Sequence, residues 1–266
     1  MIFSDVKSLV IPEGVVTKIM SGALVLWQVA KEGLEYCGTI TALSTARRTL
    51  AAVHVGNYAL FGGGQPPAGA SNVVDAYDVS LTRTKPTALS TARYALAATS
   101  VGKYALFGGG IPSAGASNVV DAYDVSLTRT KPTALSTARR YLAAVHVGDY
   151  ALFGGGKPSS GVSNVVDAYD VSLTRTKPTA LSTARYALAA TSVGKYALFG
   201  GGCEANDSAF SIVDVYDESL TCTTTNNLAS PRDDLAAATV GDHALFAGGG
   251  KTGVQIAYSY VDAYAV

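Results

Sequence analysis

Hydrophobic and polar positions follow a four-part pattern along the chain. Two nearly continuous apolar runs, LAAVHV at 50–55 and YALFGG at 58–63, are separated by Gly56 and Asn57. Apolar runs of this length predict strands buried on both faces, and Gly-Asn between them predicts a tight turn. SNVVDAYD at 71–78 predicts a third strand. SLTRTK at 80–85 alternates threonine with basic residues and ends at Pro86, which is typical of a protected outer edge strand.

The pattern recurs five times. SLTRTKPTALSTAR stands unchanged at 80–93, 126–139 and 172–185, and glycine triplets align at 62–64, 108–110, 154–156, 200–202 and 248–250. The spacing is 46 residues through the first four copies. A period of 40–50 residues with glycine-rich strands indicates the blades of a β-propeller.

The fifth copy stops at VDAYAV, without an outer strand, while LEYCGTI at 34–40 aligns with the outer strand of the other copies. We therefore expect an all-β fold, a five-bladed propeller over 34–266 in which the N-terminal strand closes the last blade. An open solenoid is the alternative, and it would leave the fifth blade one strand short. Residues 1–33 hold no copy of the repeat and predict a small β appendage, with breaks at 12–14 and 21–22.

A glycine-rich strand end, then a V-D-x-Y-D strand, then an arginine that opens the next innermost strand resembles the kelch repeat over 41–266. The usual tryptophan of the fourth kelch strand is absent, because the single tryptophan is Trp27. The chain therefore looks like a divergent bacterial kelch protein, and the functions of animal kelch adaptors are not carried over. The first 33 residues resemble short modules of phage and prophage tail-associated proteins. That likeness implies attachment to a virion, and a β appendage packed on the ring is the alternative.

The kelch resemblance places the first strand of each blade innermost and binding on the face formed by the loops between strands two and three and between blades. Arg47, Arg93, Arg139, Arg185 and Arg232 would then form a ring near the mouth of the central channel, with Arg48, Tyr94, Arg140, Tyr186 and Asp233 in the next slot. An arginine ring can hold carboxylates or sulfates with paired hydrogen bonds. The alternative is that each arginine pairs with backbone of a neighbouring blade or with the aspartate of a VDAY strand.

The loops 203–211 and 251–259 diverge most from the other copies and are expected to form the rim of this face. We expect a protein or glycan ligand there. His54 and His146 are expected beside the turn between strands one and two, away from this face, and Cys203 as an exposed thiol in a loop.

Charge and composition exclude several partners. Twenty basic residues balance twenty acidic ones, so no nucleic acid is expected. The longest apolar runs, such as 22–27, are too short for insertion into a membrane. Asp5 stands where a signal peptide has positive charge, which predicts synthesis in the cytoplasm without secretion. Three cysteines without metal spacing indicate a reducing compartment.

Catalytic chemistry is not expected. Some kelch proteins are enzymes, notably copper oxidases resembling galactose oxidase and sialic-acid epimerases, but no Tyr/Cys/His copper cluster converges here. The three histidines lack ligand spacing, so neither metal nor cofactor is expected. The sequence predicts a non-catalytic binding or display propeller on a phage or prophage tail. A bacterial intracellular scaffold and a sugar-acting enzyme are the alternatives.

Overall fold

A computed structural model describes residues 9–11, 14–18, 28–30, 38–251 and 256–266. The chain divides into two compact units, Met1–Ala42 and Leu43–Val266, which are described separately. The boundary predicted between residues 33 and 34 lies outside the described residues and stays a prediction.

The first unit contains a small antiparallel sheet. It consists of β1 (Leu9–Ile11), β2 (Gly14–Lys18) and β3 (Gln28–Ala30), in the order β1-β2-β3.

The second unit repeats one antiparallel sheet of four strands. The four complete sheets are β4 (Ala51–Val55), β5 (Tyr58–Gly62), β6 (Val74–Tyr77) and β7 (Arg83–Thr84); β8 (Ala97–Val101), β9 (Tyr104–Gly108), β10 (Val120–Asp124) and β11 (Arg129–Thr130); β12 (Ala143–Val147), β13 (Tyr150–Gly154), β14 (Val166–Asp170) and β15 (Arg175–Thr176); and β16 (Ala189–Val193), β17 (Tyr196–Gly200), β18 (Val213–Asp217) and β19 (Cys222–Thr224). These strands lie where the apolar runs and the mixed VDAY segments predicted them. The prediction of an all-β chain built from repeated sheets is confirmed. The described residues contain no helix of the length and hydrophobicity that crossing a lipid bilayer takes.

The fifth sheet has three strands, β20 (Ala236–Val240), β21 (His243–Ala247) and β24 (Val261–Ala265). A short ribbon, β22 (Gly250–Lys251) and β23 (Ile256–Ala257), lies within the loop after β21. Most of the predicted closing strand, at 34–37, falls outside the described residues, and Gly38, Thr39 and Ile40 have no strand structure. Closure by this strand therefore stays a prediction.

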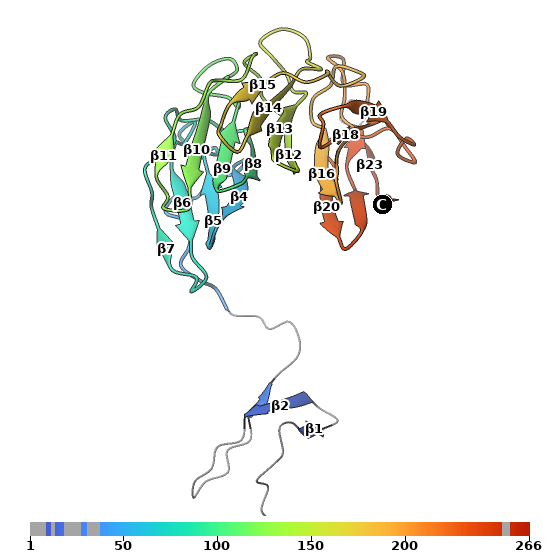
Figure 1. Ribbon diagram of the computed structural model, residues 1–266. Helices are drawn as coiled ribbons and strands as arrows, with labels where there is room; N and C mark the ends of the chain where they lie inside the picture. Colours follow the sequence, from blue (N-terminus) through green and yellow to red (C-terminus); the bar gives the residue numbers. More distant parts are fainter. Residues whose placement is uncertain (1–8, 12–13, 19–27, 31–37, 252–255) are drawn as a thin grey trace, which may run out of the picture. The chain divides into compact units, whose positions relative to one another are not determined.

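The innermost strands of successive sheets lie side by side in the order β4, β8, β12, β16, β20. Figure 1 shows the five sheets following one another along an arc. The hydrophobic core lies between neighbouring sheets, where each cluster of buried side chains draws on two of them; Leu152 of β13, for example, belongs to the same cluster as Phe199 of β17.

A phenylalanine packed on a glycine determines the spacing between sheets. The ring of Phe107 lies over Gly62, so closely that a Cβ on this glycine would be 2.6 Å from the ring. Phe153, Phe199 and Phe246 lie in the same way over Gly108, Gly154 and Gly200. In the fifth sheet this position is Ala247, which pairs with Ala236 as Gly62 pairs with Ala51. The last glycine triplet therefore aligns one residue later than the sequence comparison placed it.

Candidate functional site

The five repeated arginines are buried inside their sheets. Each forms an ion pair with the aspartate of the VDAY strand of the same copy, at 2.9 Å for Arg47 and Asp75 and 2.8 Å for Arg93 and Asp121. The remaining pairs are Arg139–Asp167 at 2.5 Å, Arg185–Asp214 at 2.7 Å, and Arg232–Asp262. All five arginine side chains are fully buried.

Backbone groups complete each pair. In the second copy, Arg93 also donates to the carbonyl of Phe107, and the Asp121 carboxylate accepts the N–H of Ser90 from the returning loop. In the first copy, burial raises the pKa of Asp75, but hydrogen bonds from Ser44 and Arg47 outweigh burial and bring this pKa below its ordinary value. The pair therefore clamps the loop that leads into each sheet.

This geometry corrects the ligand-binding role predicted for Arg47, Arg93, Arg139, Arg185 and Arg232. Their guanidinium groups point into the sheets and not into the channel mouth, so a ligand on the surface cannot reach them. The alternative considered from the sequence, pairing with the VDAY aspartate, is the arrangement that the structure shows.

The next residue of each copy behaves differently. Each forms an isolated antiparallel bridge with the residue that follows the glycines; the bridges are Arg48–Gln65, Tyr94–Ile111, Arg140–Lys157, Tyr186–Cys203 and Asp233–Gly250. We call Arg48, Tyr94, Arg140, Tyr186 and Asp233 the bridge ring. Arg48 is exposed, and Tyr94, Arg140 and Tyr186 are partly exposed, whereas Asp233 is buried. The bridge ring thus carries four of the predicted site residues at or near the surface.

Local contacts orient two of these side chains, Arg48 and Tyr186. Arg48 Nε donates to Gln65 Oε1 at 3.3 Å. The hydroxyl of Tyr186 donates to Asp207, and the Lys157 ammonium lies 4.4 Å from the centre of the Tyr186 ring. Two shallow cavities adjoin the ring, one of about 360 Å³ beside Arg48 and Gln65 and one of about 370 Å³ beside Asp233 and β22.

The predicted rim loops hold part of this surface. In the loop 203–211, Cys203 forms a second bridge with Ala209. Cys203 is completely buried, which corrects the expectation of an exposed thiol, and burial raises its pKa to about 12. In the loop 251–259, residues 252–255 lie outside the described part of the chain.

Sequence reasoning missed the residue that follows the bridge ring in each copy. Thr49, Ala95, Tyr141, Ala187 and Asp234 all have φ between 51° and 54°. The amide of each, from Ala95 onward, donates to the carbonyl of its equivalent in the preceding sheet. A bulky residue is rare in this left-handed conformation, yet Tyr141 adopts it and is 40% exposed. Its ring centre lies 6.2 Å from that of Tyr186. The residue types at this position, Thr, Ala, Tyr, Ala and Asp, do not indicate a positive φ, so the sequence could not have revealed this conformation.

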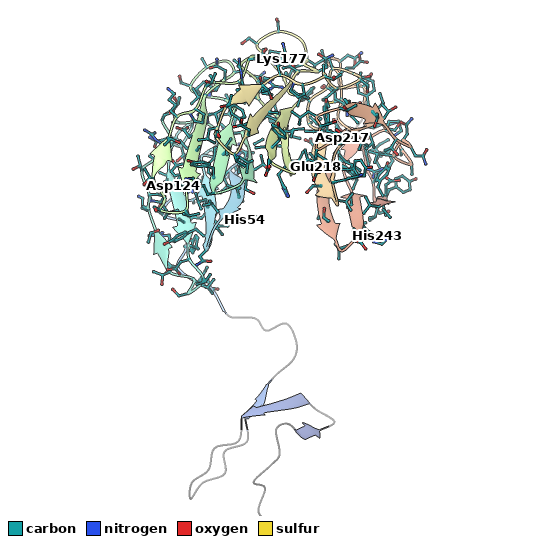
Figure 2. All side chains as sticks on the ribbon, viewed as in Figure 1. His54, Asp124, Lys177, Asp217, Glu218 and His243 are labelled. Carbon is teal, nitrogen blue, oxygen red and sulfur yellow. The ribbon has the colours of Figure 1, made fainter. Side chains whose placement is uncertain are left out.

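A further cavity lies along the inner side of the arc. It has a volume of about 640 Å³ and is lined by residues of β4, β8, β12, β16 and β20. His54 and His146 belong to this lining; they lie near the ends of β4 and β12, beside the turns that follow, as the sequence predicted. Figure 2 labels His54 on β4. Burial and the neighbouring His54 lower the pKa of His146. The described residues contain no group of three or more side chains suited to hold a metal ion.

Comparison with known proteins informs the fold alone. No protein-family model matches the sequence, and no curated protein is similar to it. A solved structure titled "Structure of YjhT" superimposes with a TM-score of 0.70 at 12% sequence identity, over 97% of this chain and 93% of that one. The repeated four-stranded antiparallel sheets and this likeness together show a propeller-like repeat fold.

Proposed function

We propose that this protein is a non-catalytic binding or display module whose ligand, a protein or a glycan bearing anionic groups, lies on the face of the bridge ring. One observation carries the proposal. The arginine and aspartate that repeat in every copy are held in internal pairs, whereas the bridge ring and its loops carry partly exposed side chains that differ between copies.

The bridge ring offers the chemistry for an anionic, carbohydrate-like ligand. Arg48 is exposed, and Arg140 Nε is buried without an acceptor in the described residues. Guanidinium groups bind carboxylates and sulfates through paired hydrogen bonds. Tyr94, Tyr141 and Tyr186 add aromatic surface that is at least partly exposed. A loop face on a rigid scaffold is a common place for binding.

The proposal includes a ring of five kelch-like blades, closed between the fifth sheet and the first. Within the arc, the glycine of the turn that follows each innermost strand packs against a side chain of the next sheet. A Cβ added to Gly56, for example, would lie 3.1 Å from Val125 Cγ1. At the two ends of the arc, the corresponding partners are Gly241 and Val79. Gly241 has nothing within 4 Å of such a Cβ, and Val79 is 78% exposed. Gly241 and Val79 each lack the neighbour that their equivalents have, which supports a contact between them. Residues 34–40 would then supply the fourth strand of the fifth blade.

The proposed setting is a phage or prophage tail, where the propeller faces a receptor and residues 1–33 attach it. An intracellular bacterial scaffold is the alternative that the same face allows. Tail genes beside the coding sequence would favour the first and their absence the second. A sugar-acting enzyme of the kelch type is the further alternative.

A glycan array read with the wild-type chain and with Arg48→Ala/Arg140→Ala tests the proposal. We expect binding to acidic glycans by the wild type, and a loss of about 1.5–3 kcal/mol for each charged hydrogen bond removed. Lys103→Ala/Lys195→Ala is the matched control, because it removes two positive charges from exposed turns elsewhere in the fold, and it should bind like the wild type. Binding unaffected by the arginine changes, or turnover of a bound sugar, would refute the proposal.

A further inference from the structure

One position of the innermost strands points side chains into the central cavity from every sheet. His54, Ser100, His146, Ser192 and Thr239 occupy the same register, each opposite an alanine of the following strand. All five line the cavity of about 640 Å³. Their strand neighbours Val55, Val101, Val147 and Val193 are buried in the core instead, as the alternation of a strand requires. We call these five residues the channel slot.

The channel slot leaves polar groups open to the cavity. The imidazoles of His54 and His146 and the hydroxyls of Ser100 and Ser192 make no side-chain hydrogen bond within the part of the chain that the structure describes. Thr239 differs, because its hydroxyl contacts Thr191 Oγ1 at 2.8 Å. Around them, Ala52, Ala144, Ala190 and Ala237 add only methyl groups. The small alanines leave room for a ligand between the polar groups.

The slot also breaks the repeat. Copies one and three carry histidine where copies two and four carry serine, although much of the surrounding sequence is identical between copies. A residue required by the blade itself would recur in each copy, as the buried arginines do. The alternation of histidine and serine therefore reflects a role in the channel and not a requirement of the sheet itself.

The lining contains no carboxylate, so nothing in the cavity wall neutralises a protonated histidine. We propose that the channel slot is an acid-dependent site for a small oxyanion of the carboxylate, phosphate or sulfate type. The imidazolium groups of His54 and His146 would bind its charge, and the hydroxyls of Ser100 and Ser192 would donate to its oxygens. Hydrogen bonds to a charged acceptor in a partly enclosed site are the stronger kind.

Other charges near this end of the channel do not replace the histidines. The turns that follow the innermost strands carry Lys103, Asp149, Lys195 and Asp242, two of each sign, with His243 beside the last. Lys103 and Lys195 lie over the rings of Tyr104 and Tyr196, and Glu218 packs on Gly148. At the other end, the bridge ring and Asp234 carry their own charges. Among the residues lining the cavity, His54 and His146 alone carry an ionisable side chain.

Sulfate is the suitable probe, because its charge stays constant from pH 5 to 8. The full chain is titrated with sulfate, and binding is followed by the Cε1–H resonances of the histidines. Sulfate should bind at pH 5.5, and its affinity should be lower by about tenfold or more at pH 8, because the imidazoles carry the positive charge. Bound sulfate should also raise the pKa of both histidines, because a nearby anion favours the charged form.

His54→Ser/His146→Ser should abolish this binding. Serine already stands in the channel slot of copies two and four, so the variant should fold, and its melting temperature checks that it does. Arg48→Ala/Arg140→Ala should bind sulfate in the channel like the wild type, which separates this site from the proposed ligand face. Sulfate binding that ignores pH or survives the double serine change would overturn the inference. Stoichiometric zinc binding lost in that variant would also overturn it, because the slot would then be a metal site.

Discussion

At the residue scale, the dominant feature is an arginine–aspartate ion pair repeated in every sheet, with both side chains fully buried in the first four sheets and the arginine fully buried in the fifth. A guanidinium and a carboxylate without water are stable only when hydrogen bonds satisfy both. Asp167 meets this demand by accepting from Arg139 and from the Ser136 amide, while Arg139 also donates to the carbonyls of Gly155 and Phe153. The pair therefore joins the returning loop to the second and third strands of the sheet.

Asp167→Ala should lower the free energy of unfolding by about 3–5 kcal/mol, because Arg139 would be left as a buried charge without a partner. Urea denaturation measures the change. Asp149→Ala is the control within the same sheet: this exposed turn position is Asn57, Lys103 or Lys195 in other copies, and the change should stay within about 0.5 kcal/mol. An equal loss of unfolding free energy in the two variants would contradict a stabilising role of the Arg139–Asp167 pair.

At the element scale, sheets meet through a phenylalanine on a glycine. Phe199 packs so closely on Gly154 that an added Cβ would lie 2.7 Å from its ring. Gly154→Ala should therefore cost about 1–3 kcal/mol of stability through overpacking. In a Phe199→Ala background the same change should cost almost nothing, because the ring that it meets is gone. Thermal or urea unfolding of the four proteins gives the coupling, and additive effects would show that this contact does not determine the sheet spacing.

A second prediction at this scale concerns β24, which pairs on one side with β21 in a sheet of three strands. Removal of residues 1–40 should lower the melting temperature, because it takes away the strand that we propose to cover this edge. Removal of residues 1–33 alone should change it little. Identical melting of the two truncations would rule out closure by residues 34–40.

At the scale of the whole molecule, the question is whether the fifth sheet meets the first. The distance from a hypothetical Cβ on Gly56 to Val125 Cβ is 3.5 Å, within the range of disulfides. In a closed ring, Gly241 and Val79 should have the same relation. Ala247 makes this seam unlike the others, because Phe61 would there meet a methyl group in place of a glycine.

Gly241→Cys/Val79→Cys, in a chain whose native cysteines are replaced by serine, should form a disulfide within one molecule on oxidation. Gly56→Cys/Val125→Cys is the matched control, with the same backbone conformation (φ of 51° and 52°) at the glycine. Mobility on non-reducing gels and the mass of the product report the result. A control that crosslinks while the seam pair stays reduced would show an open arc. Disulfides between two molecules would show that the fifth sheet of one copy meets the first sheet of another.

The sequence by itself determined the repeated strands, their turns and the outer edge strands, because apolar runs, Gly-containing turns and the proline stop act locally. It also reduced the roles of the repeated arginines to two, ligand binding or pairing within the fold. The reason is that an arginine and an aspartate, Arg93 and Asp121 in the second copy, recur in register in every copy. It did not determine which way the side chains face. A strand alternates between two sides, but what lies on each side depends on the neighbouring sheet. Only the tertiary structure therefore placed Arg93 inside its sheet and turned His54 and His146 toward the cavity on the inner side of the arc.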